Sequence, residues 1–438
     1  MPNLFFLELI ILTGIFGSPM PSENFATVFV WYIWWPLLIL FLIPFASRIW
    51  CAMCPIPAAG EWLQRKSFIE KSEGSFGLNR RWPGKLRTPL IGLLLFLFIS
   101  IFHMVFISNP LATATLMLGL SIAALAFYLV FEKRAYCRYV CPIGSFLGLY
   151  SMTSSLELRA TDRDVCVELR HSASPPCVRG TKAGYGCPWF ENPIEMKRNN
   201  YCGLCMECVK TCGPSNISLN LRFFGRDLLV KTGRNFTEAF ASLLFLSLGI
   251  FAYAMQYGPL VWMKPWAFMR SGTEDFVLYS VTHTGVVLLP ALVIFPSFLI
   301  LSKLISRGGG VSLKNVYTHY GYSLVPLGFA VWISFSLPLL FVGIPRAVSV
   351  ISDPYGWGWD LLGTKDLLLY IPYHSFIRYL RVAVAITASA FSLLTGYKIS
   401  KQLFKNKRLM LIGFAPVASF ISAVTALMVW LFMFASIG

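Results

Sequence analysis

Four closely spaced cysteines carry the clearest chemistry in this sequence. They stand in one short run, at Cys202, Cys205, Cys208 and Cys212. A C-x2-C-x2-C-x3-C spacing lets three thiolates of one tight loop bind one 4Fe-4S cubane, and the fourth cysteine usually reaches a neighbouring cluster. Zinc is the competing interpretation, because paired C-x2-C units also build tetrahedral zinc sites. Since zinc needs only two separated pairs, the compact triplet favours iron and sulfur.

Two further cysteine pairs each end in Cys-Pro just after a long apolar run. One is Cys51/Cys54 and the other is Cys137/Cys141. Proline ends a helix and frees backbone N–H groups, which can stabilise a thiolate or the sulfurs of a cluster. A tight turn at 108–110 separates two intervening apolar runs, so both pairs are expected on the same membrane face. They could share one more cluster, complete sites elsewhere in the chain, or act as free or reversibly oxidised thiols.

The elements that must position these cysteines are apolar. The 438 residues are 56% hydrophobic and 13% charged, with a mean hydropathy of +0.64, which is unlike a soluble globular protein. A short apolar run at 4–16, additional to the eight long runs given next, contains Glu8 and lacks the features of a signal peptide. We expect it to form a short first helix, with an interfacial helix as the alternative. Eight runs are long enough to cross about 30 Å of hydrocarbon, at 25–47, 89–107, 111–131, 237–255, 277–301, 321–343, 376–398 and 410–436.

The positive charges predict the orientation. Of the 37 Lys and Arg residues, 31 lie in the loops 48–88, 132–235, 302–320 and 398–408, which share one face if the spans alternate. Positive loops stay in the cytoplasm, so these loops are predicted to be cytoplasmic in a multi-pass protein of the cell membrane. All eleven cysteines lie on that reducing side, which disfavours disulfides. The net charge of +17 suits anionic lipid or an acidic electron carrier, and no motif indicates nucleic acid.

The combination of these cysteine motifs resembles a known family. The two Cys-Pro pairs followed by the run at 202–212, together with the segments 30–36 and 322–327, are similar to the membrane polyferredoxins, 4Fe-4S binding proteins of the NapH/NosR type. The resemblance is strong over about 25–225 and weak beyond. It implies electron transfer between the quinone pool, or a membrane partner, and a dedicated reductase or maturation system. Two departures are the expected absence of a NosR-like flavin domain and of a second full C-x2-C-x2-C-x3-C motif.

In place of that second motif stand three spaced cysteines. Cys166, Cys177 and Cys187 are separated by ten and nine residues, and Cys187 precedes a proline, as the last ligand of such motifs does. We predict a first cluster on Cys202, Cys205, Cys208 and Cys187, and a second on Cys212, Cys166 and Cys177 with one ligand missing. That ligand could be the pair Cys137/Cys141, His171 or Asp164. Alternatively, Cys166 and Cys177 are ordinary loop cysteines.

The predicted fold is an all-α polytopic membrane protein of eight or nine transmembrane helices with a cytoplasmic ferredoxin-like α+β 4Fe-4S insert. Its domains would be N-terminal helices at 1–131, the iron-sulfur insert at 132–235 and a C-terminal helix bundle at 236–438. Within the insert, residues 217–222 alternate between apolar and polar side chains, as a short half-buried strand does.

Histidines raise the question of haem and quinone. His103 and His283 lie in predicted spans near the outer face, where a bis-His haem b would join two helices. A lone intramembrane histidine is more often a core or quinone-site residue, so haem is the less favoured interpretation. Quinol oxidation needs a proton acceptor, for which His103, His283 and Glu238 are the candidates.

Three functional classes follow. The first is a membrane electron carrier, as a quinol dehydrogenase-type oxidoreductase subunit, that passes single electrons between quinone and a redox partner protein through two clusters, or three if the surface pairs share one. The second is a maturation or regulatory factor that reduces a metal or cofactor of another enzyme. The third is a thiol-disulfide electron carrier that uses Cys51/Cys54 and Cys137/Cys141 as dithiols.

Overall fold

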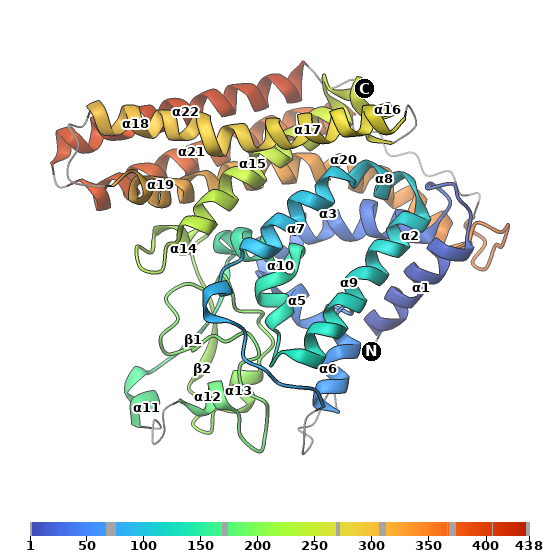
Figure 1. Cartoon of the computed structure of the whole chain (residues 1–438), viewed down its shortest axis with the longest axis horizontal. Helices are drawn as coiled ribbons and strands as arrows, with labels where there is room; N and C mark the ends of the chain where they lie inside the picture. The colour runs from blue at the N-terminus through green and yellow to red at the C-terminus, as the bar shows by residue number, and fades with distance from the viewer. Residues whose placement is uncertain are drawn as a thin grey trace. The chain divides into compact units, whose positions relative to one another are not determined.

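The computed structural model is mostly helical and describes residues 2–66, 76–168, 174–268, 272–305, 312–365, 367, 374–404 and 406–434. Its helices, labelled in Figure 1, are α1 Pro2–Phe16, α2 Phe25–Thr27, α3 Trp35–Leu37, α4 Ile43–Ala46, α5 Ile49–Met53, α6 Ala58–Arg65, α7 Leu90–Ile101, α8 His103–Ser108, α9 Pro110–Val130, α10 Pro142–Tyr150, α11 Arg163–Glu168, α12 Pro176–Arg179, α13 Glu207–Lys210, α14 Arg226–Leu229, α15 Phe236–Tyr257, α16 Lys264–Ala267, α17 Thr273–Leu289, α18 Phe295–Ile305, α19 Leu313–Gly321, α20 Val325–Ser352, α21 His374–Leu403 and α22 Lys407–Met433. Short π or 3-10 segments lie at η1 Val28–Trp34, η2 Leu38–Leu42, η3 Gly84–Leu86, η4 Tyr136–Val140, η5 Ser151–Thr153, η6 Val261–Met263, η7 Pro290–Ile294 and η8 Tyr322–Leu324.

Seven helices in the described ranges are long and apolar enough to cross a membrane. Several of them continue through π or 3-10 turns, as α17, η7 and α18 do. They are Phe25–Ala46, Pro110–Val130, Phe236–Tyr257, Thr273–Ile305, Leu313–Ser352, Phe376–Leu403 and Lys407–Met433. The run at 89–107 is instead divided into α7 and α8 at Phe102, whose ψ of 5° is not helical. The short N-terminal run forms α1, so the helix expected there is confirmed.

The chain forms two compact units, each built from several segments. Unit 1 comprises Met1–Leu9, Phe41–Phe96 and Thr115–Val230, and unit 2 comprises Ile10–Leu40, Leu97–Ala114 and Lys231–Gly438. All eleven cysteines lie in unit 1, and none forms a disulfide. Every candidate thiol ligand therefore belongs to the same folded unit.

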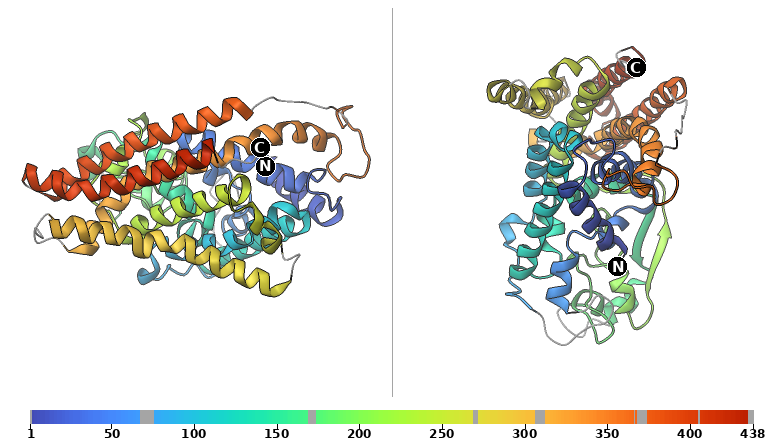
Figure 2. Two further views of the ribbon diagram at one scale, coloured as in Figure 1. Left: turned by 90° about the horizontal axis from the view of Figure 1, so that it is seen from above. Right: turned by 90° about the vertical axis from the view of Figure 1, so that its right-hand side faces the viewer.

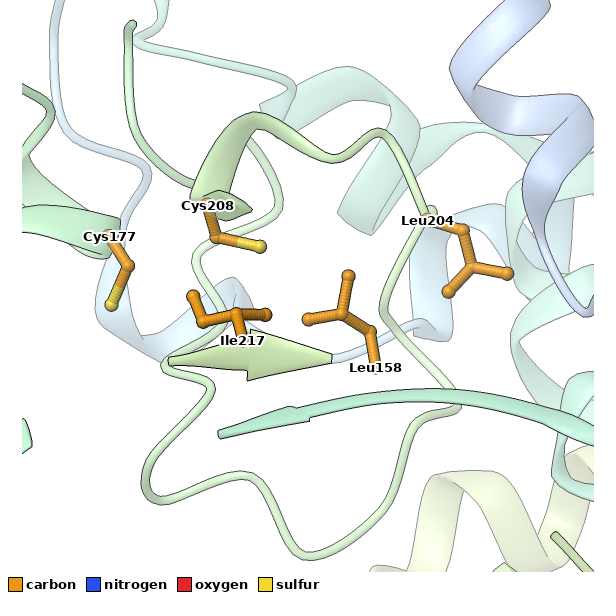
Figure 3. Packing of buried hydrophobic residues seen from close by; sticks show 5 residues of the cluster. All are labelled: Leu158, Cys177, Leu204, Cys208 and Ile217. Atoms are coloured by element: carbon orange, nitrogen blue, oxygen red, sulfur yellow. The ribbon is translucent and has the colours of Figure 1, made fainter. Parts of the chain in front are cut away.

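A two-stranded antiparallel sheet organises the cysteine-rich part of unit 1. Its strands are β1 Leu156–Ala160 and β2 Ile217–Leu221, with Leu156 opposite Leu221 and Ala160 opposite Ile217. The strand expected at 217–222 is thus confirmed. In Figure 1 the short helices α11, α12 and α13 gather near this sheet. A small core forms on it from Leu158, Cys177, Leu204, Cys208 and Ile217, so the sheet positions cysteines directly (Figure 3).

A buried ion network ties β1 to the segment that follows β2. Arg222 lies 2.7 Å from Asp227, and both side chains are almost completely buried. Glu157 on β1 accepts a hydrogen bond from Arg226, 3.2 Å away. Asp227 also accepts a hydrogen bond from the backbone N–H of Asn199, 2.8 Å away, close to the cysteine run. The network therefore connects the sheet to the loop that carries Cys202.

Unit 2 is a helix bundle, in which α21 and α22 lie side by side along most of their length (Figure 2). Its helix α15 begins after Asn235, whose side chain caps the helix by accepting from the N–H of Glu238 at 2.8 Å. The buried Glu238 carboxylate accepts a hydrogen bond from the hydroxyl of Tyr322. A carboxylate in an apolar bundle is costly unless it is hydrogen-bonded, which this pair provides.

Candidate iron-sulfur sites

Four cysteines gather into one group in the insert, which we call the first loop site: Cys187, Cys202, Cys205 and Cys208. Burial raises the pKa of the Cys202 thiol to about 12, and the neighbouring Cys205 and Cys187 contribute to the rise. Burial likewise raises the pKa of Cys208, with Cys202, Cys187 and Cys205 adding to it. The structure thus places the four cysteines of the predicted first cluster near enough to influence one another, and their binding to one cluster stays a prediction.

The loop around this site has an unusual backbone. Leu204 and Met206 have φ values of 50° and 60°, in the left-handed region that side chains other than glycine rarely adopt. Such outliers persist where the surrounding structure imposes them, and they gather at functional sites. The loop that carries Cys202 and Cys205 contains both of these residues, and Met206 is the N-cap of α13, in whose first turn Cys208 lies.

Gly203 allows the indole of Trp189 to lie against this loop. A Cβ built on Gly203 would stand 2.3 Å from Nε1 of Trp189, a side chain that is almost fully buried. We expect Gly203→Ala to displace the loop and to lower the iron content by about four atoms per chain, the number held by one cubane. Gly213→Ala is the matched control, because a Cβ on Gly213 meets no atom within 4 Å. Equal iron loss in both variants would contradict this prediction.

The remaining three insert cysteines form a second loop site: Cys166, Cys177 and Cys212. Burial raises the pKa of Cys177 to about 11, and Cys166 and Cys212 are the next contributors. Asn216 joins two of the three, since its backbone N–H lies 3.3 Å from Sγ of Cys212 and its side-chain amide 3.2 Å from Sγ of Cys166. In Figure 3 the sulfur of Cys208 points away from Cys177.

The candidates for the missing fourth ligand of the second loop site occupy different positions in the structure. Asp164 is exposed on α11. Burial raises the pKa of Cys166, and the hydrogen bond from Asn216 opposes this rise. The charges of Cys212 and then of Asp162 add to the rise, so Asp162 is the acidic residue that acts on Cys166. His171 lies outside the described residues. Cys137 and Cys141 belong to another group. Asp162 and Asn216 are the neighbours that sequence reasoning missed; their place just before α11 and just before β2 was the available signal.

The third group, the surface site, consists of Cys51, Cys54, Cys137 and Cys141. Burial raises the pKa of Cys54, and Cys137, Cys141 and Cys51 all add to this rise. Each pair follows a helix end, with Cys51 in α5 and Cys141 capping α10. The sulfur of Cys141 caps the helix by accepting a hydrogen bond from the backbone N–H of Gly144, at 3.3 Å. The two Cys-Pro pairs, each of which follows a long apolar run, therefore lie near each other. A cluster shared by both pairs requires this arrangement.

Backbone N–H groups point at several of these sulfurs, and in each case burial is the larger influence on the pKa. The N–H of Ile56 lowers the pKa of Cys54, and that of Leu204 lowers the pKa of Cys202. The backbone N–H of Trp189 likewise lowers the pKa of Cys187. In each case the donor stands two residues after the cysteine. Such hydrogen bonds favour the thiolate and are among the features that set cluster potentials.

The donor set fits iron-sulfur clusters. In the described part of the chain no three Cys, His, Asp or Glu side chains come close enough to hold a single metal ion. A cubane makes a different demand from a single ion, because each of its four thiolates binds a different iron. Burial keeps the thiol pKa values high, so positive charge from a metal is what makes these thiols bind as thiolates.

Two buried arginines line the region between the surface site and the first loop site. Arg134 makes a bidentate pair with Glu61, at 3.2 and 2.6 Å, and donates to the carbonyl of Cys51. Burial raises the pKa of Glu61, but Arg134 and Arg65 outweigh this effect and hold it below its usual value. Arg48 has no exposed surface. The guanidinium groups of Arg48 and Arg134 both lie over the ring of Trp189, at 4.9 and 5.4 Å.

The intramembrane histidines also meet, within unit 2. The Nδ1 atom of His103 lies 2.7 Å from the carbonyl of Ser100, and Nε2 of His283 lies 3.5 Å from its hydroxyl. The His283 ring packs edge-on against Phe251. Because Ser100 holds one nitrogen of each ring, the geometry describes a hydrogen-bonded polar pair. Haem ligation by His103 and His283 stays a prediction.

The part of the chain that matches a known protein family includes the surface site. The family described as the 4Fe-4S binding domain matches residues 27–78 and 113–157. These two segments contain all four cysteines of the surface site and correspond to the internal repeat of helix and Cys-Pro pair. The cysteine run at 202–212 lies outside the matched residues. No solved structure matches the chain.

Several curated proteins are similar over part of the chain. The electron transport protein YccM of Escherichia coli (strain K12) is 28% identical over 161 residues, covering 35% of this chain and 39% of YccM. The methylamine utilization ferredoxin-type protein MauN of Paracoccus denitrificans is 25% identical over 35% of this chain and 59% of MauN. Protein MJ0750 of Methanocaldococcus jannaschii is 25% identical over 43% of this chain and 78% of its own length.

The chain thus spans well under two thirds of YccM and MauN. The chain carries a match to the 4Fe-4S binding domain beside long apolar helices, and it is similar to membrane-type 4Fe-4S proteins of the ferredoxin type.

Proposed function

We propose that this protein carries single electrons through three 4Fe-4S clusters held at the surface site and the two loop sites. The observation that carries the proposal is the division of eleven free cysteines into groups of four, four and three within one unit. Clusters of this type, when bound, supply one-electron redox chemistry. The side chains of this chain hold and orient them, donate N–H groups to their ligands, and exclude water by burial.

The order of the three sites follows from their shared neighbours. Trp189 links the surface site to the first loop site, since it follows Cys187 and lies beneath Arg134, which contacts Cys51. The first and second loop sites adjoin, because Cys177 is among the thiols that raise the pKa of Cys208, after burial and the other cysteines of the first loop site. We infer a path from the surface site through the first loop site to the second.

We further propose that quinol or quinone exchanges electrons with this path, on the membrane side, and that a redox partner protein does so at the insert. Glu238 is our candidate proton acceptor, because its carboxylate is buried in an apolar bundle and accepts a hydrogen bond from the hydroxyl of Tyr322. The excess of Lys and Arg in the loops supports a cytoplasmic position of the insert, because positive loops stay on that side.

Dithiol exchange is the weaker alternative for the surface site. Exchange requires a thiolate, and buried cysteines with raised pKa values are poor nucleophiles. Burial raises the pKa of Cys141 to about 11 and also raises that of Cys137. Alkylation of the folded protein distinguishes the two ideas: ready labelling of these cysteines without loss of iron would favour dithiol exchange.

Two measurements test the proposed function. Iron and acid-labile sulfide should approach twelve atoms per chain for three clusters and eight for two, whereas four would remove the second loop site. Anaerobic addition of a quinol analogue to the oxidised protein should reduce the clusters, as followed by electron paramagnetic resonance. The Glu238→Gln variant should keep its iron and reduce more slowly. Reduction by dithionite but not by the quinol would contradict the quinone proposal and favour a maturation factor.

A further inference from the structure

Arg48 is a fully buried cation at the junction of two candidate cluster sites. It precedes α5 and follows Ser47, whose φ of 55° turns the chain at the end of α4. Its side chain has no exposed surface. The guanidinium packs directly against α10, since a Cβ on Gly144 or Gly148 would stand 3.4 Å from one of its nitrogens, an ordinary contact distance.

The contacts of Arg48 are with neutral groups. Its Nη2 donates to the carbonyl of Cys137 at 3.4 Å, and its Nη1 donates to the carbonyl of Asn200 at 3.5 Å. The guanidinium lies 4.9 Å from the ring of Trp189 and 5.9 Å from that of Tyr201. Its Nε has no hydrogen-bond partner among the described residues. Both carbonyl contacts are long for hydrogen bonds, so they offset little of the cost of burial.

Arg48 also lacks a counter-charge, unlike its neighbour. Arg134 shares the ring of Trp189 with it but is paired to Glu61, at 2.6 Å. No carboxylate of the described chain forms an ion pair with Arg48. A buried cation without an anion is costly, and proteins keep one where a counter-charge is present in the functional state.

The groups that contact Arg48 belong to two sites. Cys137 is part of the surface site, while Asn200, Tyr201 and Trp189 flank Cys202 and Cys187 of the first loop site. The charge of Arg48 also acts on the sulfur of Cys141. A cubane with four thiolate ligands is an anion, and it becomes more negative on reduction. Two such anions on either side would supply the counter-charge that Arg48 lacks.

We propose that Arg48 is the fixed positive charge shared by clusters at the surface site and the first loop site, and that it raises the reduction potentials of both. This inference rests on the proposed presence of those two clusters. Net charge and hydrogen bonds near a cluster are among the features that set its potential. A cation that both sites share stabilises an added electron on either side, which eases its passage between them.

The test is a redox titration of the full-length protein in detergent, monitored by electron paramagnetic resonance, with dithionite as the reductant. Arg48→Gln should lower the potentials of two clusters by about 59 mV, a tenfold loss in the equilibrium for adding one electron. The third cluster should keep its potential. Arg48→Lys, which retains the charge, should lie near the wild-type values.

The control removes a charge pair of similar position. Arg138 lies over the same Tyr201 ring, at 3.7 Å, and is paired with Glu191 at 2.7 Å. The double variant R138Q/E191Q removes this stacking and one charge of each sign, and Glu191 acts on Cys187 and Cys202. We therefore expect any fall in the potentials to be clearly smaller than that of Arg48→Gln. A fall as large as that of Arg48→Gln would assign the effect to the local structure and overturn the proposal.

Each remaining outcome is also informative. Unchanged potentials in an iron-replete Arg48→Gln protein would overturn the inference and leave the proposed clusters intact. A wild-type protein with only four irons would instead overturn the proposed function. If Arg48→Gln loses iron, selective loss from the surface and first loop sites, prevented in Arg48→Lys, supports the counter-charge. Equal loss from all three sites, or loss in Arg48→Lys as well, contradicts it.

Discussion

Replacing Cys54, Cys208 or Cys166 with alanine is expected to remove about four irons per chain in each case, and a different cluster each time. The reason is the division of the thiols: Cys54 interacts with Cys51, Cys137 and Cys141, whereas Cys166 interacts with Cys212. Iron and sulfide analysis gives the loss, and electron paramagnetic resonance shows which signal disappears. These are the largest effects on cofactor content that we expect from single substitutions.

Pairs of variants make the prediction sharper. Cys187→Ala should remove the same signal as Cys208→Ala, and Cys212→Ala the same signal as Cys166→Ala. Cys212 and Cys208 are only four residues apart in one motif. If all four cysteines of the motif held the same cluster, the Cys212→Ala and Cys208→Ala variants would lose the same signal. If Cys212→Ala removes the signal that Cys208→Ala removes, our division of the loop sites is wrong.

Asp227→Ala is expected to destabilise unit 1 more than any other single change to its ion pairs. The carboxylate is 1% exposed, lies 2.7 Å from the fully buried Arg222 and accepts from the N–H of Asn199. Its removal leaves Arg222 only the longer contact to Glu157, at 3.6 Å, and breaking a buried pair costs about 3–5 kcal/mol. Thermal unfolding in detergent, followed by circular dichroism and by loss of cluster absorbance, should show an earlier transition.

The matched control is an exposed pair in the same unit. Lys210 lies 3.2 Å from Glu207, but half of its side chain is exposed. Exposed pairs contribute about 0–1 kcal/mol, so Lys210→Met should leave the transition almost unchanged. A comparable loss in both variants would indicate that burial of the Arg222–Asp227 pair does not govern its contribution.

Much of this protein could be predicted from local patterns. The apolar runs predicted the long helices, because twenty apolar residues bury poorly in anything but a membrane or a large core. Alternation at 217–222 predicted β2, since its side chains face the core in turn. The spacing of Cys202, Cys205 and Cys208 indicated one cluster, because three ligands on so short a loop have few other ways to converge.

Other features depended on long-range contacts. The run at 89–107 has enough apolar residues for one span, yet the helix breaks at Phe102, a position that hydropathy does not distinguish. The sequence offered Asp164 as a neighbour of Cys166, but in the folded chain the charge that acts on Cys166 is that of Asp162. Cys137 and Cys141, which act on Cys54 together with the adjacent Cys51, lie more than eighty residues away, so only the folded chain brings them near.

By itself the sequence determined the chemistry: eleven thiols, their confinement to one stretch, and the apolar helices around them, all of which follow from residue type and short spacing. The tertiary structure decided which thiols share a site and left Arg48 buried without a carboxylate between two of those sites. The physical reason is that ligand type and loop reach are local properties. Burial, charge compensation and the meeting of distant segments arise only when the whole unit folds.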